Sequence, residues 1–121
     1  MKFSWSTLNV KNMNESIRFY TDIVGLEVVE RFEGEPDLEI AFLGSGKTQI
    51  ELKCDGKTHK PEVGKDISWG FETESLDQTL ALMKENGVVV DSGPYQPNPH
   101  LRFFCVKDPN GLKIQFLEKI K

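Results

Sequence analysis

The stretch SWSTLNV at residues 4–10 returns in altered form as ISWGFET at residues 67–73, about 63 positions further along the chain. A second pair of segments follows the same rule, because QIELK at residues 49–53 aligns with KIQFL at residues 113–117 with an offset of about 64. The chain therefore carries one half-domain twice. A duplicated module of this kind can line a single cleft from both sides.

Bulk composition restricts the class of protein and of partner. The 121 residues (13.8 kDa) suffice for one domain, and 28% charged with 38% hydrophobic residues is typical of a globular chain. A net charge of −4 and a pI near 5.2 disfavour nucleic-acid partners, which require clustered cations. No apolar run could span a membrane and the N-terminus lacks a signal-peptide pattern, so we expect a cytoplasmic protein without a membrane partner. Cys54 and Cys105 are expected to be reduced, buried thiols.

Alternation and turn residues predict the order β-α-β-β-β in both halves. Asn12 or Asn14 caps the first helix and Ser75 the second, and Gly25 and Gly87 end them. The first helix is expected to pack through Met13, Ile17, Phe19, Tyr20 and Val24. Strands are expected at residues 3–10, 26–32, 38–43, 48–54, 66–73, 101–106 and 112–117, and residues 88–90 are expected to start a further strand before a proline-rich loop at residues 93–100. One module thus covers residues 3–54 and the other residues 66–121, joined by a linker at residues 55–65.

These modules predict an α+β fold in which curved mixed sheet surrounds a central cleft and the helices lie outside. Because side chains alternate along a strand, one face of each module packs under its helix and the other lines the cleft. The residues expected under the helices are Leu8, Val10, Ile50, Leu52, Ile67, Phe71, Ile114 and Phe116. The cleft residues are Trp5, Thr7, Gln49, Glu51, Lys53, Ser68, Gly70, Glu72, Lys113, Gln115 and Leu117.

Three motifs resemble signatures of a known family: NVKNMNESIRFY at residues 9–20, the Gly25-Leu26 pair that follows, and DPNG at residues 108–111. They are similar to those of the vicinal oxygen chelate superfamily, which includes glyoxalase I, fosfomycin resistance enzymes, extradiol dioxygenases and bleomycin resistance proteins. The resemblance covers essentially the whole chain, and it implies one such domain over residues 1–121 and a homodimer. It does not specify the reaction, because many chemistries share this scaffold.

In metal-dependent members of that superfamily, four side chains on the first and last strands of the two modules hold a divalent ion. The corresponding positions here are Trp5, Glu51, Ser68 and Gln115, and only Glu51 matches the expected ligand. An indole has no lone pair for a metal, and hydroxyl and amide oxygens are weak ligands. We therefore expect no metal and no other cofactor; the alternative is a zinc, nickel or manganese ion. Glu118 cannot replace Gln115, since a shift by an odd number of residues puts it on the helix-covered face.

Two function hypotheses follow. In the first, the protein is a metal-independent binder of the bleomycin resistance type, in which an aromatic or cationic small molecule stacks on Trp5 and pairs with Glu51 or Glu72. The candidate ligand-binding residues are Trp5, Thr7, Gln49, Glu51, Ser68, Glu72, His100, Arg102, Lys113 and Gln115. Alternatively, Trp5 only fills the vacant metal space as core, with Glu51 hydrogen-bonded to Gln115.

In the second hypothesis, the protein is a glyoxalase I-like lyase or isomerase of the lactoylglutathione lyase type, with or without a divalent metal. Glu51 is then the catalytic base that removes a proton next to a carbonyl. Without a Lewis acid, Gln115, Ser68 or Lys113 would have to stabilise the enediolate, which each does far less well than a divalent ion. His59 is expected to be an exposed linker residue under either hypothesis.

Overall fold

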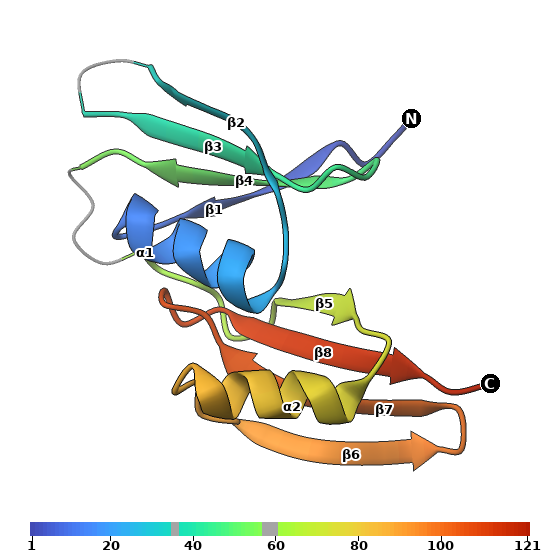
Figure 1. Ribbon diagram of the computed structural model, residues 1–121. Helices are drawn as coiled ribbons and strands as arrows, with labels where there is room; N and C mark the ends of the chain where they lie inside the picture. Colours follow the sequence, from blue (N-terminus) through green and yellow to red (C-terminus); the bar gives the residue numbers. More distant parts are fainter. Residues whose placement is uncertain (35–36, 57–60) are drawn as a thin grey trace. The chain divides into compact units, whose positions relative to one another are not determined.

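A computed structural model describes residues 1–34, 37–56 and 61–121, and the chain divides into two compact units, Met1–Glu62 and Val63–Lys121. His59 lies outside the described residues. The first unit contains β1 (Trp5–Asn9), α1 (Met13–Arg18), the π-helical turn η1 (Phe19–Ile23), β2 (Val28–Glu33), β3 (Glu39–Leu43) and β4 (Gln49–Cys54). The second contains β5 (Ser68–Glu72), α2 (Leu76–Glu85), β6 (Ser92–Asn98), β7 (Leu101–Lys107) and β8 (Lys113–Lys119) (Figure 1). Both units therefore have the predicted order β-α-β-β-β.

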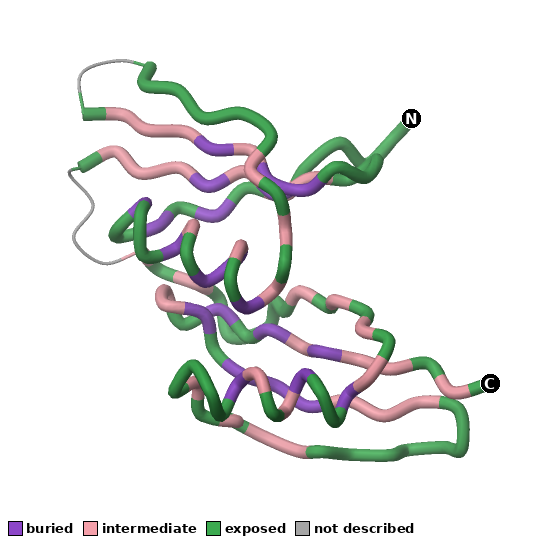
Figure 2. The backbone as a smooth tube through the Cα atoms, viewed as in Figure 1, coloured by how far each residue is buried: buried purple, intermediate pink, exposed green. Residues whose placement is uncertain are grey.

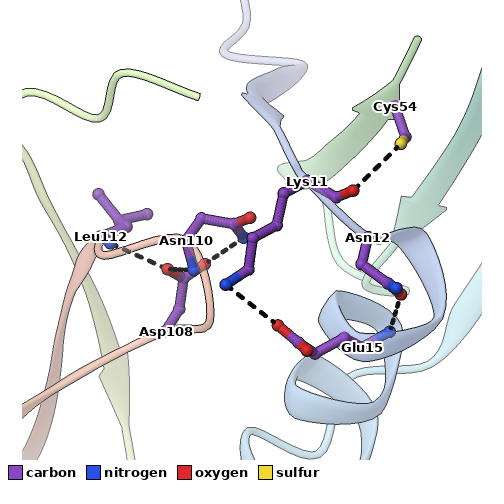
Figure 3. Close-up of polar contacts among 7 residues, drawn as sticks. All are labelled: Lys11, Asn12, Glu15, Cys54, Asp108, Asn110 and Leu112. Carbon is purple, nitrogen blue, oxygen red and sulfur yellow. Dashed lines mark hydrogen bonds and ion pairs between the residues drawn. The ribbon is translucent and has the colours of Figure 1, made fainter. Parts of the chain in front are cut away.

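The first unit is a four-stranded mixed sheet in the order β1-β4-β3-β2, with β1 parallel to β4 and the other pairs antiparallel. Asn12 caps α1 as predicted, because its Oδ1 accepts a hydrogen bond of 2.9 Å from the Glu15 N–H (Figure 3). After Arg18 the helix widens into η1, and Gly25 follows its C-cap with a φ of 85°.

The buried residues of the first helix differ in part from those predicted with a spacing of 3.6. Met13, Phe19 and Tyr20 are buried as expected, whereas Ile17 and Val24 are only half-buried. Their places are taken by Ser16 and Ile23.

The second unit repeats this architecture, with the strand order β5-β8-β7-β6. Ser75 caps α2 as predicted, its Oγ accepting a hydrogen bond of 3.2 Å from the Gln78 N–H. The prediction was wrong for the next segment: residues 88–90 do not start the strand, and β6 (Ser92–Asn98) begins at Ser92 and covers most of the expected proline-rich loop. This strand accommodates Pro94 and Pro97 because it is an edge strand with an irregular register against β7.

The strand registers confirm the repeat. Trp5 pairs with Gln49 in the first sheet and Ser68 pairs with Lys113 in the second, so the same offsets of about 63 and 64 relate the two pairs. Both sheets put their parallel strand pair at the same end of the strand order. The strands form two separate four-stranded sheets rather than one continuous sheet.

Burial follows the predicted alternation, with two exceptions (Figure 2). Six of the eight residues expected under the helices are buried: Leu8, Val10, Ile50, Leu52, Ile114 and Phe116. Phe71 is only half-buried, and Ile67 is 60% exposed because it precedes the first paired residue of β5. Both cysteines are free thiols; Cys105 is buried and Cys54 only half-buried. No helix in the described part of the chain is long and apolar enough to cross a membrane.

Candidate functional site

Each sheet has a helix-covered face and an opposite face, which we call the helix-free face. Arg31 marks the helix-covered face of the first sheet, because its Nη2 donates to Asn14 Oδ1 of α1 at 2.9 Å. Trp5, Thr7, Gln49 and Glu51 have the opposite parity along β1 and β4. All four predicted candidates of the first module therefore share its helix-free face.

Trp5 presents an aromatic surface on this face. Its side chain is 51% exposed, and its ring lies edge-on against the Phe42 ring with 5.4 Å between the centroids and 76° between the planes. Phe42 holds the indole from one side and leaves the rest of it open to solvent. The residues of its own sheet therefore do not enclose Trp5.

Glu51 is the acidic group beside this surface. It is half-buried and opposite Thr7 in the β1–β4 register, and Thr7 Oγ1 donates to Glu51 Oε1 at 2.5 Å. Glu51 forms no ion pair with any residue that the structure describes. One carboxylate oxygen is therefore held by a neutral donor, and the carboxylate as a whole lacks a counter-ion.

Gln49 on β4 pairs with Trp5 on β1 and lies on the same face of the sheet. Its Nε2 donates to the Gly44 carbonyl at 3.1 Å, which fixes the amide along the end of β4. The amide oxygen, an acceptor, then lies on the helix-free face next to Trp5. This face of the first sheet therefore combines an exposed aromatic ring with oxygen acceptors.

The second sheet places its predicted candidates on the equivalent face. Ser68 pairs with Lys113 and Gly70 with Gln115 along β5 and β8. A Cβ atom added to Gly70 would lie 3.7 Å from Gln115 Oε1, so the glutamine side chain lies over the glycine. Glu72, at the far end of β5, forms an exposed ion pair of 3.5 Å with Lys119.

The structure moves two candidates away from these faces. Arg102 lies on the helix-covered face of the second sheet, where its Nη2 donates to Asp77 Oδ1 of α2 at 3.3 Å. The reason is parity: Arg102 pairs with Glu118, and Glu118 Oε1 accepts a hydrogen bond of 2.7 Å from the Leu76 N–H at the start of α2. That contact confirms the predicted face of Glu118. His100 is in the turn between β6 and β7, with its Nδ1 at 3.1 Å from the Ile120 carbonyl oxygen.

Comparison with known families agrees with this architecture. The sequence family model of the Glyoxalase/Bleomycin resistance protein/Dioxygenase superfamily matches residues 2–116 of the chain. The chain belongs to this superfamily. The resemblance found in the motifs is thereby confirmed, and it extends over nearly all of the chain.

The proteins to which the chain is similar, by sequence or by structure, include enzymes and a binding protein. The chain is 28% identical over 127 residues to the lactoylglutathione lyase of Neisseria meningitidis serogroup A, covering 98% of the chain and 91% of the relative. It is 29% identical over 129 residues to that of Escherichia coli O157:H7, covering 98% and 93%. Among solved structures, the trypanothione-dependent glyoxalase I of Leishmania major has a TM-score of 0.79 at 22% identity, with 98% of this chain and 86% of that chain covered. TnmS3, an antibiotic binding protein from Streptomyces sp. CB03234, has a TM-score of 0.79 at 22% identity, with 98% and 96% covered. These structures share the fold.

The residues at the superfamily's metal positions do not fit a divalent ion. On the first sheet, the Trp5 indole offers no lone pair and Glu51 already accepts from Thr7. On the second sheet, Ser68 and Gln115 offer only neutral oxygens, which bind divalent ions weakly without carboxylate or imidazole partners. Over residues 1–34, 37–56 and 61–121, no three His, Cys, Asp or Glu side chains gather as a metal-binding group. The donor set thus disagrees with the ligand pattern that the resemblance implies.

Sequence reasoning missed Phe42 as part of the candidate site. Phe42 pairs directly with Glu51 across β3 and β4, which puts it on the helix-free face between Glu51 and the end of the sheet. The available signal was the short turn at residues 44–48, because the length of a hairpin connection determines which residues of its strands face each other. The site is therefore more aromatic than the sequence prediction made it.

Proposed function

We propose that this member of the superfamily is a metal-independent small-molecule-binding protein that sequesters an aromatic, cationic compound. The observation that carries the proposal is the presence, on one sheet face, of a half-exposed Trp5 and of a Glu51 carboxylate that has no counter-ion among the described residues. A planar cation satisfies both groups at once, because it stacks on the indole and neutralises the carboxylate.

The neighbouring residues prepare these two groups for binding. Phe42 limits rotation of the indole by its edge-on contact, and Thr7 fixes one oxygen of Glu51. A group that is already held in place loses less conformational entropy when a ligand binds. The formal net charge of −4 adds a general attraction for a cation.

Fluorescence of Trp5 provides a direct test. The chain has two tryptophans, so a Trp69→Phe variant leaves Trp5 as the only one. Titration with ethidium, a planar aromatic cation, is expected to quench its fluorescence in a saturable manner, and Glu51→Gln in the same background is expected to weaken binding by about tenfold, a loss of roughly 1.4 kcal/mol. Phenanthrene, a neutral ring system of similar size, is the control, and Glu62→Gln controls for the change in net charge.

Two results would contradict the proposal. One is a panel of aromatic cations in which none quenches Trp5 or raises the melting temperature of the protein. The other is one equivalent of nickel, zinc or manganese found by elemental analysis in protein purified without added metal.

A glyoxalase I-like lyase or isomerase is the second candidate function. It is favoured by the matched relatives named lactoylglutathione lyase, which align over more than nine-tenths of the chain. Glu51 is the proposed base of this reaction, as a half-buried carboxylate on the sheet face that also carries the Trp5 and Phe42 rings. Formation of lactoylglutathione from methylglyoxal and glutathione, lost in Glu51→Gln and measured with and without added nickel, zinc or manganese, would make it the leading candidate.

We also propose that the protein acts as a homodimer in the cytoplasm. Family membership supports the dimer, and the ordinary globular composition supports the location. Light scattering at micromolar concentration is expected to give about twice the chain mass of 13.8 kDa. A monomer mass would exclude the dimer.

A further inference from the structure

A row of three side chains crosses the helix-free face of the second sheet. Ser68 on β5 pairs with Lys113 on β8, and Lys113 pairs on its other side with Lys107 on β7. Paired residues of neighbouring strands project from the same face, so two ammonium groups and a hydroxyl lie on three adjacent strands. Both lysines are exposed.

The two lysines are directly opposite each other and have no acidic partner. Neither forms an ion pair with a residue in the described part of the chain. Like charges opposite each other in an antiparallel pair are unfavourable, so the fold gains nothing from this arrangement. Lys119 differs: it is on the same face of the same strand, β8, and pairs with Glu72 at 3.5 Å.

The repeat shows that the architecture does not require this charge. With the offsets of about 63 and 64, the equivalent row of the first sheet is Trp5, Gln49 and Gly44. That row is uncharged, and its amide donates to the carbonyl within the row at 3.1 Å. In the first module, the side-chain amide of Gln49 thus has a hydrogen-bond acceptor within its own row. In the second module, the ammonium groups of Lys107 and Lys113 have no acidic acceptor among the described residues.

We propose that Lys107, Lys113 and Ser68 form a subsite for the oxyanion group of a small molecule, with a phosphate-type dianion as the preferred group. Each ammonium offers three donors and no acceptor, and the hydroxyl of Ser68 adds a directed donor. The amide of Gln115, two residues along β8 on the same face, adds a further one. A dianion bound here also relieves the repulsion between the lysines, which a carboxylate with one charge does only in part.

The subsite fits a small ligand rather than a nucleic acid. Only two lysines form the row and the chain as a whole is acidic, whereas nucleic-acid binding requires many cations along a backbone. Ser68, Lys113 and Gln115 are also among the candidate ligand-binding residues, but the subsite contains neither Trp5 nor Glu51, the two groups that carry the aromatic-cation proposal. Loss of phosphate binding and loss of cation binding are therefore separate results.

The test is a titration of the ¹⁵N-labelled full chain with inorganic phosphate at constant ionic strength, followed by amide chemical shifts. We expect saturable shifts at residues 68, 107 and 113. Lys107→Gln and Lys113→Gln are each expected to weaken phosphate binding about threefold, which is typical of one exposed charge, and the double variant to remove saturation. Lys119→Gln, the matched control on the same face of β8, is expected to leave the affinity unchanged.

Three results would overturn the proposal: no saturable shift at these residues, equal shifts with chloride, or a double variant that still binds phosphate while its spectrum shows the native fold. Acetate provides the second arm. Phosphate binding that is tighter than acetate binding supports the dianion preference, and acetate binding of equal or greater strength overturns it. Trp5→Ala is expected to leave phosphate binding intact.

Discussion

Replacement of Glu118 by alanine is expected to destabilise the second unit without weakening ligand binding. Glu118 Oε1 accepts a hydrogen bond of 2.7 Å from the N–H of Leu76, the first residue of α2. Leu76 is fully buried, at 0% exposure, so water cannot replace the lost acceptor without rearrangement. Glu118 therefore accepts a hydrogen bond from the first N–H of the helix, as the Ser75 cap does from the N–H of Gln78.

The magnitude follows from two contributions. A hydrogen bond to a charged group contributes about 1.5–3 kcal/mol, and an anion at a helix N-terminus about 0.3–1 kcal/mol. Because Glu118 is only half-buried, we take the lower part of this range, about 2 kcal/mol for Glu118→Ala. For a chain of this length that corresponds to a fall of about 8 °C in melting temperature. Glu118→Gln retains an oxygen acceptor without the charge and should cost about half as much.

Urea unfolding and thermal melts of the purified full chain provide the assay, with Glu85→Ala as the matched control. Glu85 is exposed at the other end of α2, where an anion is slightly unfavourable, so its removal should change stability by less than about 0.5 kcal/mol. Ethidium affinity of Glu118→Ala, measured well below its melting temperature, should equal that of the wild type. The reasoning is refuted if Glu118→Ala is no less stable than Glu85→Ala, or if it loses ligand binding while the fold persists.

Three further substitutions test the packing described above. Asp108 Oδ1 accepts a hydrogen bond of 2.9 Å from the buried Leu112 N–H (Figure 3), so Asp108→Ala should lower the free energy of unfolding in urea by about 2 kcal/mol. Asp108→Asn retains an oxygen acceptor and should recover about half of this loss. Equal losses in the two variants would contradict this role of Asp108. Gly93→Ala would place a Cβ 3.1 Å from a backbone carbonyl at a φ of 92°, so its melting temperature should fall further than that of Gly111→Ala, where φ is 90° but nothing lies within 4 Å. Phe104→Ala empties a fully buried site and should cost about 3–5 kcal/mol by chemical denaturation; a loss below about 1 kcal/mol would show that this core is not closely packed.

The sequence was sufficient to predict the architecture of each unit, because the two halves could be read against each other. Alternation assigned Trp5 and Glu51 to one face and Leu8 and Leu52 to the other, and the registers bear this out. Single polar residues before each helix identified the caps. These features depend on local chemistry that repeats at a known period.

The errors arose where local pattern and three-dimensional position diverge. Ile23 in the π-helical turn is buried in place of Val24, and nothing in the composition of the segment signals a change of helical type. Arg102 was named as a candidate together with residues of the cleft face, but its parity within β7 puts it on the helix-covered face. Alignment of the two halves at an offset of about 63 makes Arg102 equivalent to Glu39, which lies on the helix-covered face of the first sheet.

The candidate site was predictable in its parts but not in its contacts. Trp5, Thr7 and Glu51 were expected on one face, and the structure adds which of them touch: Thr7 bonds Glu51, and Phe42 supports the indole. Contacts of this kind depend on rotamers and on the offset between strands that are not consecutive in the chain. The alternation of side chains along a strand predicts which face of the sheet a residue lies on, but it does not predict which residues it contacts.

The prolines of β6 also bear on how the molecule stays apart from its own copies. A proline ring nitrogen has no hydrogen, so Pro94 and Pro97 cannot donate a backbone hydrogen bond from this edge strand. The register of β6 against β7 is also irregular around Tyr95. Missing donors and an irregular register make the strand a poor template for a further strand, which disfavours edge-to-edge aggregation.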